Sequence, residues 1–346
     1  MNRARTLVIL GTGGTIAGVA SAGGDNLHYR AAQLPIEALL AAVPQLREQL
    51  QAHQASLVAE QILQRDSKDM EPADWLQMAR RIAQHLRQPD VRAVILTHGT
   101  DTLEETAWFL HRVLPASAKP VILVSAMRPA TAPDADGPQN LRDACALALA
   151  DGTPGGVMAV NTGVLHHAGH VRKAHPYRLA SFSSGEYGPL GWIEAGQLRL
   201  AAPGMVPLSQ PGSQDTPDWH GGGHHQHLLA WTDTDGPPAP AVAWVTSHAG
   251  FEPRAIDALV QAGFAGAVVA ATGNGTLHHR LEAALQQACR QGLWVWITTR
   301  CAEGVVVGGE RPADLPAHGE WRCVPLPAAK ARVEMLLQRW QADYNQ

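Results

Sequence analysis

The first segment whose residue types could support chemistry is the glycine- and threonine-rich stretch at residues 11–18, which reads Gly-Thr-Gly-Gly-Thr-Ile-Ala-Gly. It directly follows an apolar run, and turns after buried strands are where α/β sheets bind ligands. Its glycines let the backbone approach a ligand closely, and we expect Gly14 to contact substrate in this way. Exposed N–H groups there could receive an oxyanion, and Thr15 is a candidate nucleophile. The alternative is that Thr15 only closes a turn or caps a helix.

Two familiar phosphate-binding motifs do not fit this turn. A dinucleotide fingerprint that begins at Gly11 needs glycine or alanine where Ile16 stands. A P-loop that begins at Gly13 needs Lys followed by Ser or Thr, where the chain has Val19 and Ala20. A nucleotide-dependent oxidoreductase is therefore disfavoured.

A second turn of similar character occupies residues 97–106 and reads Thr-His-Gly-Thr-Asp-Thr-Leu-Glu-Glu-Thr. It also follows an apolar run. A helix start that resembles a capping box explains Thr102 and Glu105. It does not explain Thr100 and Asp101, which place a hydroxyl beside a carboxylate at the expected carboxyl edge of the sheet.

Both turns require strands and helices that alternate along the chain. Apolar runs on consecutive positions predict strands that are covered on both faces, as in a parallel sheet. These runs lie at residues 7–10, 94–96, 121–124, 157–160, 241–245, 267–270 and 293–297. Helical periodicity predicts helices at residues 35–51, 73–87, 102–114, 140–150, 253–262, 277–290 and 328–340.

A change of composition suggests where the domains divide. Residues 201–240 are rich in proline, glycine and histidine and show no periodic pattern, so we expect a linker there. The predicted domains are an N-terminal α/β catalytic domain at 1–200 and a smaller α/β domain at 241–346. His220, His224, His225 and His227 lie in this linker without a carboxylate or cysteine beside them, so we predict no metal site.

Bulk properties point to a small-molecule partner. A net charge of −4 over 346 residues, with no run of Lys or Arg, gives no electrostatic signature for nucleic acid or membrane binding. The 4 cysteines are far apart and form no CxxC pair, which argues against disulfides and zinc. The apolar run before Gly11 is too short for a signal peptide, so we expect a cytoplasmic protein.

Together the two turns strongly resemble the signatures of the bacterial-type asparaginase/glutaminase family. The likeness continues in four further motifs and so spans nearly the whole chain. They are Ala-Met-Arg-Pro at 126–129, Asp-Gly-Pro-Gln-Asn-Leu at 136–141, Tyr-Gly-Pro-Leu-Gly at 187–191 and Gly-Asn-Gly at 273–275.

This resemblance implies a fold and an activity. The expected fold is a Rossmann-like N-terminal domain with a mostly parallel sheet and a smaller flavodoxin-like α/β C-terminal domain. The expected reaction is hydrolysis of the side-chain amide of L-asparagine through a threonyl ester and without a cofactor, and use of L-glutamine as well stays open. The expected assembly is a homotetramer of intimate dimers whose active sites lie between subunits.

The resemblance also implies catalytic roles. Thr15 corresponds to the primary nucleophile, and Tyr29 to a tyrosine on a mobile lid that helps to activate it. Thr100, Asp101 and Lys173 correspond to a second cluster that serves proton transfer or polarises the attacking water.

Substrate recognition requires donors for an α-carboxylate and an acceptor for an α-ammonium group. By resemblance Ser67 contacts the carboxylate, Asp101 the ammonium group, and Asn274 supports the same group. Lys68 departs from the pattern of periplasmic-type members, where glutamine is typical. It either points at the α-carboxylate or pairs with Asp69, and it puts the acceptance of glutamine in doubt.

One further carboxylate is expected from the neighbouring subunit, with Glu310 the best match by spacing and Glu303 the competitor. Two rival functions are a broad glutaminase-asparaginase and a non-catalytic amino-acid-binding protein of the same fold. L-Glutamine is longer than L-asparagine by one methylene. Such a difference changes the binding free energy in a pocket by only about 1–3 kcal/mol, so the site discriminates poorly between the two substrates.

Overall fold

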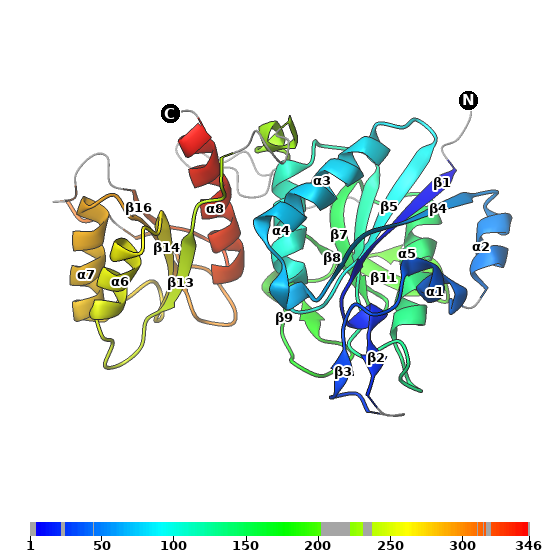
Figure 1. The fold of residues 1–346 in the computed structure, drawn as a ribbon, viewed down its shortest axis with the longest axis horizontal. Helices are drawn as coiled ribbons and strands as arrows, with labels where there is room; N and C mark the ends of the chain where they lie inside the picture. The colour runs from blue at the N-terminus through cyan, green and yellow to red at the C-terminus, as the bar shows by residue number, and fades with distance from the viewer. Residues whose placement is uncertain are drawn as a thin grey trace. The chain divides into compact units, whose positions relative to one another are not determined.

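The chain divides into two compact units, Met1–Ala230 and Trp231–Gln346. The structure, a computed structural model, describes residues 5–21, 25–43, 45–201, 222–230, 237–309, 311–313, 315 and 320–344. Each unit is an α/β layer structure (Figure 1). The predicted α/β fold, with a mostly parallel sheet in each half, is confirmed.

The N-terminal unit contains an eight-stranded sheet in the order β12-β11-β8-β7-β6-β5-β1-β4. Five strands, from β7 to β4 in that order, are parallel, and the last three pair antiparallel at the other edge. The strands are β1 (Thr6–Gly13), β4 (Ser56–Arg65), β5 (Val91–Thr97), β6 (Pro120–Val124), β7 (Gly156–Asn161), β8 (Val164–His167), β11 (Gly191–Glu194) and β12 (Gln197–Leu200).

Helices cover both faces of this sheet because its central strands are apolar on consecutive residues. One core joins alternate residues of β1, β5, β6 and β7 to α1 (Ile36–Ala41), α2 (Leu46–Ala52) and α5 (Gly137–Leu149). On the opposite face α3 (Pro72–Leu86) packs on β5, and α4 (Leu103–Val113) packs on β7 (Figure 1).

Short elements lie beyond the carboxyl ends of the strands. After β1 comes a 3₁₀ turn, Thr15–Ala17, and then a small hairpin of β2 (Val19–Ala20) and β3 (Tyr29–Arg30). A 3₁₀ turn, Ser67–Asp69, follows β4. A second small hairpin pairs β9 (Arg172–Lys173) with β10 (Phe182–Ser183). Because β1, β4, β5 and β6 run parallel, the segments that follow them meet at one edge of the sheet.

The C-terminal unit has a parallel sheet of four strands in the order β13-β14-β15-β16. Helices α6 and α7 contribute to a core on one face, and α8 packs against β13, β14 and β15. The elements are β13 (Val242–Thr246), α6 (Arg254–Gln261), β14 (Gly266–Ala271), α7 (His279–Arg290), β15 (Trp294–Thr299), β16 (Trp321–Cys323) and α8 (Ala328–Tyr344).

The structure differs from the sequence-based expectations at residues 35–51, in the expected linker, and at β4, a strand that was not predicted. The single helix predicted at 35–51 is two helices, α1 and α2, and Gln45 between them has a φ of 57°. The proline at position 44 lacks the N–H that a continuing helix would need. Within the expected linker, residues 226–230 form a 3₁₀ turn, and Leu228 is fully buried against the N-terminal unit. The remainder of that stretch at 202–221 and 231–236 lies outside the described residues.

Among the described residues, no helix combines the length and apolar character needed to cross a membrane.

Candidate active site

The two glycine- and threonine-rich turns touch each other. They follow β1 and β5, which are neighbours in the sheet. Gly14 has a φ of 79°, which glycine adopts without strain, and a Cβ added there would lie only 2.4 Å from the Cα of Gly99. The close approach therefore requires glycine. It brings the residues that follow each glycine, Thr15 and Thr100, to the same region of the edge.

Thr15 is paired with a tyrosine from the small hairpin. Its Oγ1 lies 2.9 Å from the Oη of Tyr29, and either oxygen can be the donor. Thr15 is buried, and Tyr29 is half-buried at the start of β3. A tyrosine oxygen that accepts the threonine proton would orient the Oγ1 lone pairs for attack. This geometry suits an activated threonine nucleophile.

The second threonine is held by a lysine. The Nζ of Lys173 donates to Thr100 Oγ1 at 2.9 Å and to Asp101 Oδ1 at 2.6 Å. Lys173 lies in β9, far from the turn in sequence, and its side chain is largely buried while that of Asp101 is half exposed. Because the ammonium group occupies a lone pair of Thr100, the hydroxyl proton can point elsewhere, toward a substrate or a water.

Ser67 joins this arrangement from the third strand. It follows β4, which pairs with β1 on the side opposite β5. Ser67 Oγ accepts from the backbone N of Asp101 at 3.3 Å, and its carbonyl oxygen accepts from Thr102 Oγ1 at 2.7 Å. Since its oxygen is the acceptor in the first bond, the hydroxyl hydrogen remains available for an anion. A hydroxyl donor thus lies beside the backbone of Asp101, whose carboxylate is half exposed.

Lys68 turns toward carboxylates of its own segment. Its Nζ contacts Asp66 and also Asp69, the latter at 3.2 Å. These contacts raise the pKa of the Lys68 ammonium, and Asp66 has the larger effect. Of the two alternatives considered for Lys68, the structure shows the carboxylate pairing, with Asp66 as a second partner.

A buried histidine fixes the turn that carries Thr100. The Nδ1 of His98 lies 2.7 Å from the carbonyl oxygen of Gly99, so this nitrogen is the donor. Its Nε2 lies 2.9 Å from Thr106 Oγ1, which in turn accepts from Trp75 Nε1 at 2.9 Å. Burial lowers the pKa of His98 to about 4, so the ring is neutral at physiological pH. His98 has no role among the sequence-based expectations, although a histidine between a buried strand and a glycine is visible in the chain.

A third loop, which follows β6, is ordered by a carboxylate. Asp136 accepts from the backbone N of Met127 and of Arg128, each at 3.0 Å. Asn140 Nδ2 donates to Asp136 at 3.1 Å and to the carbonyl oxygen of Ser125 at 2.9 Å. These bonds account for the two motifs at 126–129 and 136–141.

Three expected site residues belong to the C-terminal half of the chain. Asn274 follows β14, and both ends of its amide bond the backbone of Val307, at 2.9 and 2.8 Å. Glu303 is exposed. Glu310 lies outside the described residues. The places of Asn274, Glu303 and Glu310 relative to Thr15 stay predictions.

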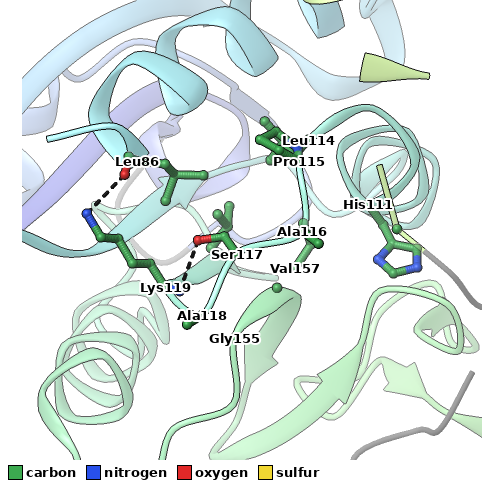
Figure 2. A pocket seen from close by; sticks show the side chains of 13 residues that line it. Leu86, His111, Leu114, Pro115, Ala116, Ser117, Ala118, Lys119, Gly155 and Val157 are labelled. Carbon is green, nitrogen blue, oxygen red and sulfur yellow. Dashed lines mark hydrogen bonds between the residues drawn. The ribbon is translucent and has the colours of Figure 1, made fainter. Parts of the chain in front are cut away.

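A separate cavity of about 330 Å³ lies away from these threonines, where the loop before β6 meets the start of β7 (Figure 2). Figure 2 shows its lining of small and apolar side chains, and Lys119 donates there to the carbonyl oxygen of Leu86 at 2.9 Å. None of the described residues that line it is a carboxylate. The lining therefore lacks the acidic side chain that would pair with an α-ammonium group, and the candidate site stays at the opposite edge.

The histidine-rich stretch packs at one end of α4. The backbone N of His225 donates to the carbonyl oxygen of Arg112 at 2.9 Å, and the His225 ring is buried. His220 lies outside the described residues. Over the part of the chain that the structure describes, no group of three or more His, Cys, Asp or Glu side chains could hold a metal ion.

Two family models match the chain. The N-terminal domain of asparaginase matches residues 6–204, and the glutaminase/asparaginase C-terminal domain matches residues 241–341. The chain belongs to the bacterial-type L-asparaginase family. It is thus an amidohydrolase by family, and the threonine-rich turns lie within the N-terminal match.

Individual members of the asparaginase family are similar over almost the full chain. A glutaminase-asparaginase of Acinetobacter glutaminasificans is 32% identical over 96% of this chain and 94% of its own. L-asparaginase 2 of Escherichia coli is 33% identical over 96% of this chain and 88% of its own. The structure of a probable cytoplasmic L-asparaginase from Campylobacter jejuni has a TM-score of 0.82 at 31% identity, over 97% and 95% of the two chains.

Proposed function

We propose that the chain hydrolyses the side-chain amide of L-asparagine to L-aspartate and ammonia. The observation that carries the proposal is that two hydrogen-bonded threonine hydroxyls follow the neighbouring strands β1 and β5. Thr15 lies beside Tyr29, and Thr100 lies beside Lys173. The names of the Acinetobacter and Escherichia coli relatives, glutaminase-asparaginase and L-asparaginase 2, support the choice of amide.

Recognition of the free amino acid follows from the charges nearby. The α-carboxylate accepts from the Ser67 hydroxyl, whose hydrogen is not used in the bond with Asp101 N. The α-ammonium group donates to the Asp101 carboxylate, which is half exposed and has a second oxygen beyond the one that Lys173 contacts. These two contacts place the side-chain amide toward the threonines.

The first chemical step forms an ester. Thr15 Oγ1 attacks the amide carbon while its proton passes toward Tyr29, and a C–O bond forms. The backbone N–H of Thr15 stabilises the oxyanion of the tetrahedral intermediate, since the N–H of Gly14 already donates to the carbonyl oxygen of Arg65. The C–N bond then breaks, and the nitrogen leaves as ammonia after it has taken up the proton that Thr15 released.

The second step consumes one water. Thr100, oriented by the Lys173 ammonium, aligns the water that attacks the ester carbon. The C–O bond to Thr15 breaks, the threonine oxygen takes up one proton of the attacking water, and aspartate leaves. No redox change occurs, so the cycle needs no reactant beyond the amide and water.

The main alternative is a broad glutaminase-asparaginase, which the name of the Acinetobacter relative favours. One extra methylene in the substrate is a small difference for a pocket to detect. Lys68 stands where glutamine is typical, and its ammonium group is held by Asp66 and Asp69. The site therefore lacks a glutamine side-chain amide that could help to bind the longer substrate, L-glutamine. We expect asparagine to be the better substrate.

The test is parallel turnover of L-asparagine and L-glutamine by the purified chain, together with mass spectrometry of rapidly quenched enzyme. A mass increase that corresponds to a β-aspartyl ester on the peptide with Thr15 supports the mechanism. Turnover without any ester on that peptide, or an ester on another residue, contradicts it. A folded chain that binds asparagine without releasing ammonia would favour the binding-protein alternative.

We also propose a homotetramer that acts in the cytoplasm. The similar Campylobacter jejuni structure is that of a probable cytoplasmic L-asparaginase, whereas the Haemophilus influenzae relative is named a probable periplasmic one. Light scattering at micromolar concentration tests the assembly, and cell fractionation tests the location. A monomer with full activity would contradict the expected role of a carboxylate from a neighbouring subunit.

A further inference from the structure

The small hairpin that carries Tyr29 is supported by a segment from a different part of the chain. Each of its strands, β2 and β3, is two residues long. An isolated two-stranded hairpin is at best marginally stable in water, and one this short needs outside support. The support comes from residues 129–134, which follow β6. The backbone N of Ala130 donates to the carbonyl oxygen of Gly18 at 2.9 Å.

One side chain of that segment reaches the strand opposite Tyr29. Thr131 Oγ1 accepts a hydrogen bond from the backbone N of Ala20 at 2.8 Å. Ala20 is the residue that pairs with Tyr29 across the hairpin. The Tyr29 hydroxyl in turn lies 2.9 Å from Thr15 Oγ1. A continuous series of contacts therefore runs from Thr131 through Ala20 and Tyr29 to Thr15.

We propose that Thr131 is a positioning residue for Tyr29, which acts by fixing the hairpin at Ala20 so that the tyrosine hydroxyl stays beside Thr15. This inference rests on the proposed function, because the role of Tyr29 in turnover is part of that proposal. Thr131 itself is not placed near the substrate, and its contact is with backbone alone.

The other two contacts of the segment are weaker candidates for this role. The bond between Ala130 and Gly18 joins two backbones and is independent of side-chain identity. Asn26 Nδ2 lies 3.4 Å from Asp134 Oδ1, which is long for a hydrogen bond, whereas the Thr131 contact, which is exposed to water like this one, is 2.8 Å long. The side-chain contribution therefore depends chiefly on the Thr131 oxygen.

The kinetic test compares Thr131→Val, which keeps the shape but removes the oxygen, with Thr131→Ser, which keeps the oxygen. Loss of one neutral hydrogen bond corresponds to about a three- to tenfold change in a population. We expect kcat for asparagine to fall by about that factor in Thr131→Val, KM to change little, and Thr131→Ser to retain most of the activity. Thr153→Val is the matched control, since the Thr153 hydroxyl donates to the carbonyl oxygens of Leu147 and Ala150 at the end of α5.

Thr131→Val in a Tyr29→Phe background distinguishes an effect on the position of the Tyr29 hydroxyl from a general loss of structure. If Thr131 acts through the tyrosine hydroxyl, Thr131→Val causes no further loss once that hydroxyl is gone. An equal loss in both backgrounds would overturn the proposal. So would unchanged activity of Thr131→Val in the chain with Tyr29.

Hydrogen exchange tests the contact without any turnover. We expect the amides of residues 19–21 and 25–30 to exchange several times faster in Thr131→Val than in the unmodified chain, while Thr131→Ser and Thr153→Val leave them unchanged. Unchanged exchange in Thr131→Val overturns the inference even if the enzyme is active. If the unmodified chain releases no ammonia, the proposed function is wrong, and the exchange result still decides whether Thr131 holds the hairpin.

Discussion

The hydroxyl oxygens of Thr15 and Tyr29 lie 2.9 Å apart although the two residues belong to different short elements, a 3₁₀ turn and a two-residue strand. The turn follows β1 directly, and the strand returns to it by pairing with β2. Because the tyrosine comes from a separate hairpin, the position of that hairpin sets the distance between the two oxygens. We therefore expect its geometry to control the first chemical step.

Removal of the tyrosine hydroxyl should slow turnover without abolishing it. In Tyr29→Phe the ring still packs, but Thr15 loses the oxygen at 2.9 Å. A positioned proton-transfer group contributes about 10²-fold or more, so we expect kcat to fall by about 10²-fold. Steady-state ammonia release measures this, and Tyr177→Phe, at an exposed tyrosine, is a matched control. Full activity of Tyr29→Phe would remove the tyrosine from the mechanism.

Loss of the second threonine should be as severe as loss of its lysine. Lys173 donates to both Thr100 and Asp101, so we expect the three groups to act as a unit. We expect Thr100→Val and Lys173→Met each to reduce kcat by about 10³-fold or more, and the double variant to be little worse than either. Losses that multiply in the double variant would show that the two residues act separately.

The buried His98 should make stability depend on pH. Its pKa in the fold is about 4, below the ordinary value of 6.5, because burial disfavours the charged ring. The unfolded chain therefore binds more protons between those values, and stability falls as the pH drops from about 6.5 toward 4. The shift corresponds to about 3 kcal/mol.

Denaturant unfolding of the unmodified chain and of His98→Gln, at pH 7 and pH 4.5, measures this effect. Glutamine can donate to Gly99 O but does not titrate, so we expect the variant to lose less stability on acidification. His53→Gln changes an exposed histidine and is the control. An identical loss in all three proteins would contradict the role given to His98.

Asp143 on α5 should have the opposite effect on stability. Burial raises the pKa of this carboxyl, and the hydrogen bond from Gln139, at 2.8 Å, only partly offsets the cost. The charged form is thus less favoured in the fold than in the unfolded chain. We expect Asp143→Asn to raise Tm at pH 7, and the gain to shrink at acidic pH as the native carboxyl takes up a proton. A lower Tm at pH 7 would show that the charge is stabilising.

The main helices and strands could be predicted because each is marked by a pattern of apolar residues within its own segment. Consecutive apolar residues identify strands such as β1 and β5, and the turns after them place Thr15 and Thr100 at one edge. The edge strand β4 was not predicted, since its residues alternate only loosely between exposed and half-buried positions. The break between α1 and α2 was missed although the proline at position 44 indicates it.

The contacts of the site depend on tertiary structure, so fewer of them could be predicted from the sequence. Lys173 lies in a two-residue strand that no periodicity marks, and only the family resemblance singled it out. His98 and Thr131 act through residues distant in sequence, Thr106 and Ala20, so spacing gives no signal for them. The carboxylate expected at Glu310 lies outside the described residues and stays a prediction.

The most direct test of the central claim is ammonia release from L-asparagine by the purified chain and by Thr15→Ala, with circular dichroism and light scattering to show that both are folded alike. We expect steady turnover by the unmodified chain and a loss of about 10⁴-fold in the variant, because the variant lacks the oxygen that forms the ester. Turnover by Thr15→Ala close to that of the unmodified chain would contradict Thr15 as the nucleophile, and no turnover by either folded protein would contradict the proposed reaction itself.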